Sequence, residues 1–128
     1  MDLDPEIKRL CDLVRMSGYD AHRYLRHGHL EKVYERSLCN RLRAHGLQVE
    51  SQFALPVYDE DGSLLGDFYA DLFIEGKIIV EIKACNLINN AHIAQIIGYL
   101  RTSRIEHGLL LNFGAPKFYV KKFILSDI

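Results

Sequence analysis

The sequence predicts an α/β fold, more closely an α+β arrangement, in which a mixed sheet is flanked by helices. Three observations predict it. Helical periodicity fills the first third of the chain, three strand-like segments with short turns follow, and a later helical segment separates two apolar strands. Because that helix can connect parallel neighbours, the order α-α-β-β-β-α-β-β indicates one mixed sheet. We expect a single domain over residues 1–128, with N-terminal helices over about 5–45 and the sheet with its helix over about 47–124.

Two helices are predicted in the first third. Residues 5–16 form the first, with Pro5 suited to its opening turn and Gly18 just past its expected end. Residues 29–45 form the second, which we expect to end at His45 and Gly46, because glycine readily adopts the left-handed conformation that closes a helix.

The rest of the chain is predicted to alternate between strands and one helix. Turn-forming residues over 59–62 and 75–77 separate the first three strands, and Asn89 or Asn90 is expected to cap the helix. Strands are expected over residues 47–58, 64–75, 78–85, 108–114 and 118–124, and the helix over 90–104.

The composition excludes several classes of protein. No apolar run approaches the roughly 20 residues that span a bilayer, so we expect no membrane association, and the acidic start MDLDPEIKRL lacks the apolar stretch of a signal peptide. The cysteines are far apart and form no CxxC pair, which argues against a disulfide framework, a zinc ribbon or an iron–sulfur cluster. A cytoplasmic location is expected. These cysteines are Cys11, Cys39 and Cys85.

The net charge of -1 conceals an uneven distribution. Residues 46–82 contain eight acidic side chains and one basic, whereas residues 83–128 contain six basic and two acidic. This distribution indicates either a basic face beside an acidic pocket or two solvated surfaces of opposite sign.

Charged residues interrupt the otherwise apolar strand IIVEIKA at residues 78–84. Since strand side chains alternate, Glu81 and Lys83 share one face. A hairpin symmetric about Gly76 places Asp71 directly across from Glu81, and Lys83 across from Tyr69. The same alternation assigns one face of the preceding strand to Phe68, Ala70, Leu72 and Ile74.

Two opposed carboxylates on a half-buried sheet repel each other, about 5 Å apart at their Cβ atoms. A raised pKa, the Lys83 ammonium or a divalent cation could relieve the repulsion, and Mg²⁺ suits such an oxygen site. The alternative is a partly exposed strand edge that carries an ordinary Glu–Lys pair.

Two helices carry further polar candidates. Glu31 falls within the apolar arc of its helix, where it could serve a metal, or where it could simply be an acid stabilised by the dipole at the helix start. Gln95 and Tyr99 lie one turn apart beside the small residues Ala91 and Gly98, an arrangement that permits close approach of a ligand or forms a plain solvent face.

Taken in order, these residues resemble the GxxExxY family, a branch of the PD-(D/E)XK nuclease superfamily, over roughly residues 20–124. Ala70 replaces the proline of the superfamily name, and histidines flank Gly28. The motifs are Gly28-His29-Leu30-Glu31-Lys32-Val33-Tyr34, Ala70-Asp71, Glu81-Ile82-Lys83, Gln95-x-x-x-Tyr99 and Leu111-Asn112-Phe113-Gly114.

The resemblance implies a restriction-endonuclease-like αβββαβ core and a phosphodiesterase site that uses Mg²⁺ or Mn²⁺. By position, Asp71 and Glu81 would bind the metal, with the Ile82 carbonyl as a third ligand. Lys83 would activate the attacking water and offset charge on the phosphorane. Glu31 would hold a metal-bound water or a second metal, and Gln95 with Tyr99 would position the scissile strand or Lys83.

The sequence therefore favours a metal-dependent nuclease acting on DNA or RNA. The alternative is a catalytically silent module that binds nucleic acid or a protein, and a homodimer or protein partner could supply specificity. Zinc hydrolase chemistry is disfavoured, because His27 and His29 form the only close histidine pair. We expect backbone phosphates to contact Lys117, Lys121 and Lys122, unless the last strand is an edge protected by its lysines.

Overall fold

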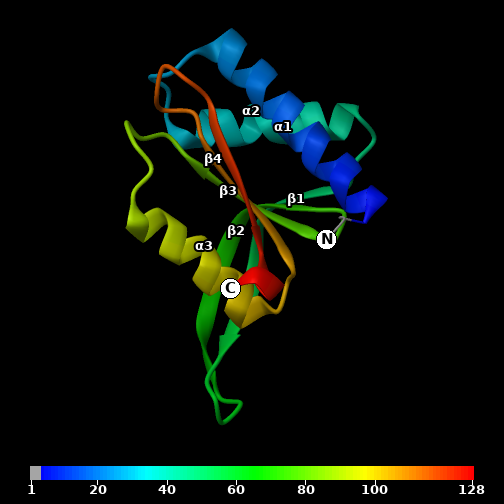
Figure 1. Ribbon diagram of the computed structural model, residues 1–128, viewed down its shortest axis with the longest axis vertical. Helices are drawn as coiled ribbons and strands as arrows, with labels where there is room; N and C mark the ends of the chain where they lie inside the picture. Colours follow the sequence, from blue (N-terminus) through cyan, green and yellow to red (C-terminus); the bar gives the residue numbers. More distant parts are fainter. Residues whose placement is uncertain (1–3) are drawn as a thin grey trace.

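The computed structural model describes residues 4–128, and Figure 1 shows their arrangement. Met1 to Leu3, part of the start that was predicted to be no signal peptide, lie outside the described residues. The sheet runs in the order β1-β2-β3-β4-β5 and is antiparallel except for the parallel β3–β4 pair, which α3 connects. The predicted mixed sheet is confirmed. The elements are α1 (Pro5–Leu25), α2 (Glu31–Ala44), β1 (Val49–Tyr58), β2 (Leu64–Ile74), β3 (Ile78–Lys83), α3 (Asn90–Ser103), β4 (His107–Asn112), β5 (Tyr119–Ile124) and the short 3₁₀ helix η1 (Leu125–Asp127).

Helix α1 begins as predicted but does not end near residue 16. Asp4 caps it by accepting a hydrogen bond from the Glu6 amide, and Pro5 occupies the first turn. The helix continues through Gly18, which is a packing position and not a helix end. A Cβ atom there would lie 2.6 Å from the Phe118 ring, so only glycine lets that ring approach the helix.

The other predicted helix boundaries are confirmed within a residue or two. After α2, Gly46 has a φ of +81°, the left-handed conformation expected at a helix end. Before α3, the Asn89 side chain accepts a hydrogen bond from the His92 amide, and the His92 ring accepts one from the Asn89 amide.

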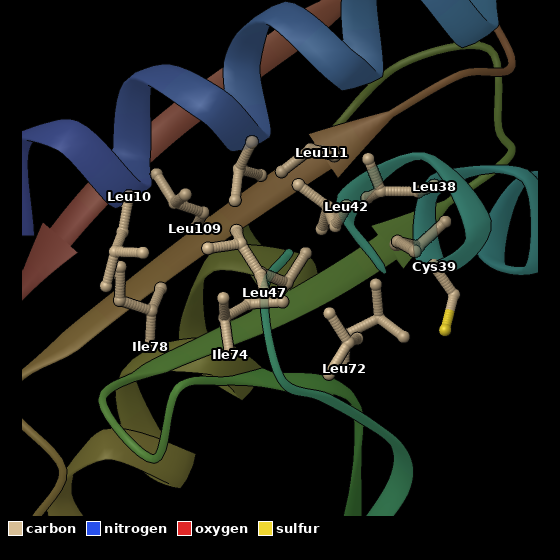
Figure 2. Packing of buried hydrophobic residues seen from close by; sticks show 14 of the residues in the cluster. Leu10, Leu38, Cys39, Leu42, Leu47, Leu72, Ile74, Ile78, Leu109 and Leu111 are labelled. Atoms are coloured by element: carbon tan, nitrogen blue, oxygen red, sulfur yellow. The ribbon is translucent and has the colours of Figure 1, made fainter. Parts of the chain in front are cut away.

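The sheet separates two hydrophobic cores. Helices α1 and α2 cover one face, and α3 covers the other. Figure 2 shows the larger core, where leucines of both helices meet Leu72, Ile74 and Ile78 of β2 and β3. We name the two sides the α2 face and the α3 face.

Strands β1 and β2 pass from one face to the other partway along their length. Leu72 and Ile74 lie in the α2-face core as predicted, but Phe68 and Ala70 lie in the α3-face core. The predicted regular alternation is therefore wrong for the residues of β2 that precede Asp71. The pairs Ser51–Leu72 and Phe53–Ala70 place Gln52 opposite Asp71, and Gln52 has a φ of +53°, which breaks the two-residue period.

No helix within residues 4–128 is long and apolar enough to cross a membrane. The three cysteines are free, as their spacing predicts.

Candidate functional site

The candidate site lies where β2 and β3 stop pairing. The two strands pair at Leu72–Val80, Phe73–Ile79 and Ile74–Ile78, which is the register predicted from a turn centred on Gly76. Beyond Leu72 the ladder ends. The predicted pairing of Lys83 with Tyr69 does not form.

At this point a side chain replaces the backbone partner. The Ile82 amide donates a hydrogen bond to Asp71 Oδ2 at 2.7 Å. Asp71 therefore caps the end of the ladder, as a carbonyl of β2 would otherwise do. We name this region the fork and define it as Asp71 of β2 with Glu81, Ile82 and Lys83 of β3.

Glu81 is the buried acid of the fork, with 4% of its surface exposed. Burial raises the pKa of Glu81 to about 9, and the adjacent negative charge of Asp71 adds to the shift. Its Oε1 atom is buried and has no hydrogen-bond partner among the described residues. A buried carboxyl oxygen without a hydrogen bond destabilises the folded protein. A ligand that contacted this oxygen would remove part of that cost.

Asp71 is held on both sides. Its Oδ1 atom accepts a hydrogen bond from Gln52 Nε2 at 3.2 Å, and its Oδ2 atom accepts the Ile82 amide. Burial raises the pKa of Asp71, while the Ile82 amide opposes that shift by stabilising the ionised form. The structure thus brings the two predicted carboxylates together and fixes the orientation of one.

Lys83 reaches from the fork to α3, where its Nζ atom donates to Gln95 Oε1 at 2.8 Å. Tyr99, one turn further along α3, stacks on Phe68 with ring centroids 3.7 Å apart. Burial raises the pKa of the Tyr99 hydroxyl, and the charge of Glu81 contributes. Gln95 and Tyr99 therefore line the site, and the alternative of a plain solvent face is excluded for Tyr99.

The acids on α2 are arranged differently from the prediction. Glu31 lies in the first turn with much of its residue surface exposed, and partial desolvation of its carboxyl and the charge of Asp71 raise its pKa. The acid that points into the protein is Glu35, which is 5% exposed. Among residues 4–128, no three His, Cys, Asp or Glu side chains are grouped to hold a metal, so Glu31 does not join Asp71 and Glu81 in such a cluster.

The tyrosine of the G-x-x-E-x-x-Y motif has a structural role. The Tyr34 hydroxyl donates to the Arg26 carbonyl and accepts from the His29 amide, and its ring stacks on Phe113 at 4.7 Å. These contacts fasten the α1–α2 connection to the core. His29 bonds the Leu25 carbonyl through its ring, as a histidine in a structural position does.

The three lysines predicted to contact nucleic acid do not form one patch. Lys121 lies on the α3 face above the Phe123 ring, whereas Lys122 lies on the α2 face, where its amine contacts His107 and Cys11. Lys117 instead borders a cavity of about 340 Å³ whose lining contains no acidic residue. That lining consists of Tyr19, His22, Arg23, Arg26, Pro116, Lys117 and Phe118.

A mixed sheet with paired carboxylates and a lysine at a strand fork defines a restriction-endonuclease-like domain. A family model for the PD-(D/E)XK nuclease superfamily matches residues 8–123, and the chain belongs to this superfamily. No curated protein and no solved structure matches the chain. Membership suggests nuclease activity and contact with nucleic acid, and nucleases of this superfamily generally use divalent metal ions.

The residues of the fork fit such an ion. Mg²⁺ is commonly held by one or two carboxylates, with waters and substrate oxygens completing its shell. The fork supplies two carboxylates, one of which has an oxygen without a hydrogen-bond partner in the described part of the chain. The N–H and C=O groups of a strand residue point to the same side, so the Ile82 carbonyl is directed toward the fork as well.

Proposed function

We propose that the protein is a Mg²⁺- or Mn²⁺-dependent phosphodiesterase that hydrolyses DNA or RNA and belongs to the GxxExxY branch. The buried Glu81 carboxyl carries this proposal, because one of its oxygens has no hydrogen-bond partner within residues 4–128 and lies beside a second acid and a lysine. A hydrophobic residue would pack there at lower cost, so the acid indicates a ligand.

Each residue of the fork has a distinct role in the proposed reaction. Asp71, Glu81 and the Ile82 carbonyl hold the cation, which supplies Lewis-acid polarisation of the phosphate when bound. Lys83 orients the attacking water and neutralises charge that develops on the phosphate. Gln95 accepts a hydrogen bond from the Lys83 amine and so restricts where that amine can lie.

A nuclease assay with matched lysine variants tests this proposal. Purified wild type, Lys83→Ala and Lys77→Ala would be incubated with Mn²⁺ and with single- and double-stranded DNA and RNA. We expect Lys83→Ala to lose roughly 10²- to 10³-fold in cleavage rate, while Lys77→Ala, changed in the exposed turn before β3, keeps it. Equal cleavage by wild type and Lys83→Ala would identify a contaminant and contradict the proposal.

We further propose that nucleic acid contacts the basic cavity formed by Arg23, Arg26 and Lys117. Its cations come from the end of α1, the residue that follows it and the β4–β5 connection; the lining contains no acidic residue, although Arg23 also pairs with Asp20 at 3.8 Å. The exposed Tyr19 beside them offers a ring for base stacking. Of the three lysines predicted from the sequence, only Lys117 belongs to this surface.

The salt dependence of binding tests the cavity. Each phosphate contact contributes roughly 0.7 to 0.9 to the slope of log affinity against log salt. Replacing Arg23, Arg26 and Lys117 with alanine should lower that slope by about two or three, measured with metal-free protein. Replacing Lys8, Arg9 and Arg15, in the first half and middle of α1, removes the same charge. An equal fall in the salt slope for that variant would contradict a specific role for the cavity in nucleic-acid binding.

One observation favours the alternative, a catalytically silent module that binds nucleic acid. Among residues 4–128, Glu31, the further acid that the family resemblance implies, is not grouped with Asp71 and Glu81. Such a module would bind nucleic acid equally well in wild type, Asp71→Asn and Glu81→Gln, and none of the three would cleave it with Mg²⁺ or Mn²⁺ present.

A further inference from the structure

The Gln52 side chain lies between two carboxylates. Its Nε2 atom is 2.7 Å from Glu35 Oε1 and 3.2 Å from Asp71 Oδ1. Because both neighbours are acceptors, the amide nitrogen and not its oxygen must face them, and each amide hydrogen serves one acid. One amide group therefore links an acid of α2 to an acid of the fork.

Glu35 is a firm anchor for this link. It is 5% exposed, and besides Gln52 it accepts hydrogen bonds from Lys32 Nζ at 2.9 Å and Ser51 Oγ at 3.1 Å. These donors come from α2 itself and from β1. A buried carboxylate with three donors has little freedom to rotate.

The backbone at Gln52 is also unusual. A φ of +53° is left-handed, a conformation that costs a residue other than glycine free energy and persists only where the surroundings enforce it. This residue lies opposite Asp71, at the point where β1 and β2 change faces. The left-handed turn points the Gln52 amide at both acids.

We infer that Glu35 and Gln52 are positioning residues that hold the Asp71 carboxylate against the Ile82 amide. Each Asp71 oxygen keeps a further lone pair for a ligand, so the link orients the carboxylate without occupying it. Only the identity of that ligand rests on the proposed function. The placement of Asp71 stands on these contacts alone.

Amide hydrogen exchange in metal-free protein tests the placement directly. Gln52→Gly can adopt the left-handed backbone without strain and removes the side chain that carries the amide link. We expect the Ile82 amide to exchange about tenfold faster in this variant, close to its rate in Asp71→Ala, while amides of Ile78 to Val80 keep their protection. An unchanged Ile82 rate in Gln52→Gly would overturn the inference, even if the unfolding midpoint falls.

Further variants distinguish loss of the specific hydrogen-bonded link from a general effect of removing a polar side chain. Glu35→Gln retains an oxygen that can accept from Gln52, so it should accelerate Ile82 exchange less than Glu35→Ala does. Gln48→Ala, an exposed glutamine just before β1, should change nothing. Equal acceleration by Glu35→Gln and Glu35→Ala, or by Gln48→Ala, would contradict a specific link.

Mn²⁺ titration calorimetry adds a readout for the ligand. Loss of an outer hydrogen bond to a metal ligand typically weakens binding tenfold or more, so Gln52→Gly should bind Mn²⁺ about tenfold more weakly than wild type. Unchanged Mn²⁺ affinity in Gln52→Gly would contradict the inference. If wild type binds no Mn²⁺, the proposed function fails, whereas the Ile82 exchange rates still decide the placement of Asp71.

Discussion

The two ends of the β2–β3 pair differ in backbone pairing and in the polarity of their buried side chains. At the turn end, three consecutive residue pairs are apolar and buried and belong to a regular backbone ladder. At the fork, the Ile82 amide of one strand donates to the Asp71 side chain of the other, and Glu81 is buried with an oxygen that has no hydrogen-bond partner among the residues that the structure describes. The apolar pairs at the turn end stabilise the fold. The buried charged groups at the fork destabilise it, because they are held close together.

The proposed function therefore lies in the same short hairpin that forms the centre of the fold. Buried polar groups are costly unless they are fully paired, and sites where proteins retain that cost are commonly functional. The predictions below test whether the two ends are as separate as the structure indicates.

The largest expected effect of a single substitution on stability lies at the turn end. Leu72→Ala would leave a cavity in the α2-face core and should lower the free energy of unfolding by about 2–5 kcal/mol, measured by urea denaturation. Mn²⁺ affinity measured on the folded variant should stay as in wild type. A large loss of Mn²⁺ affinity would show that the two ends are coupled.

The second effect is a pH dependence that originates at the fork. Folded Glu81 keeps its proton up to a pKa of about 9, whereas the unfolded chain releases it near the ordinary value of 4.5. Between these values the folded state binds more protons, so metal-free stability should fall as pH rises, by up to about 1.4 kcal/mol per pH unit. Denaturation midpoints from pH 5 to pH 9 would measure it.

Glu81→Gln is the control for this pH dependence. The amide cannot ionise, so the variant should lose most of the decline and be more stable than wild type at pH 8 without metal. A decline of equal slope in Glu81→Gln would assign the effect to other groups, of which Asp71 is the nearest with a raised pKa.

The smallest expected effect concerns Gly98 of α3, the helix that also carries Gln95 and Tyr99. A Cβ at Gly98 would have no atom within 4 Å, so Gly98→Ala should stabilise the protein by up to about 1 kcal/mol through helix propensity. Gly18→Ala is the matched comparison and should destabilise, because its Cβ would meet Phe118. Weaker nucleic-acid binding by Gly98→Ala would show that the substrate approaches α3 at this position.

The sequence was sufficient to predict the hairpin register and therefore the meeting of Asp71 and Glu81. A turn centred on Gly76 and the positions of the charged residues within two apolar strands leave one register that places Asp71 and Glu81 on the same face. The Asn89 cap and the strand boundaries followed from equally local signals.

Glu35 and Gln52 were missed for physical reasons. The angular position of a residue on a helix does not tell how far along the core it lies, and Glu31 occupies the first turn, past the edge of the core. The left-handed φ of Gln52 has no sequence signature, since glycine and asparagine are the usual residues in that conformation. By contrast, strand alternation alone predicts that Lys121 and Lys122 point to opposite faces.

The central claim is that Asp71 and Glu81 bind a divalent cation between them. Mn²⁺ titration calorimetry at pH 8 on metal-free wild type, Asp71→Asn and Glu81→Gln tests it most directly, with Lys83→Ala as a variant that keeps both acids. We expect binding in wild type and in Lys83→Ala, and its loss in the two acid variants. Binding of equal affinity in all four proteins, or in none, would contradict the claim.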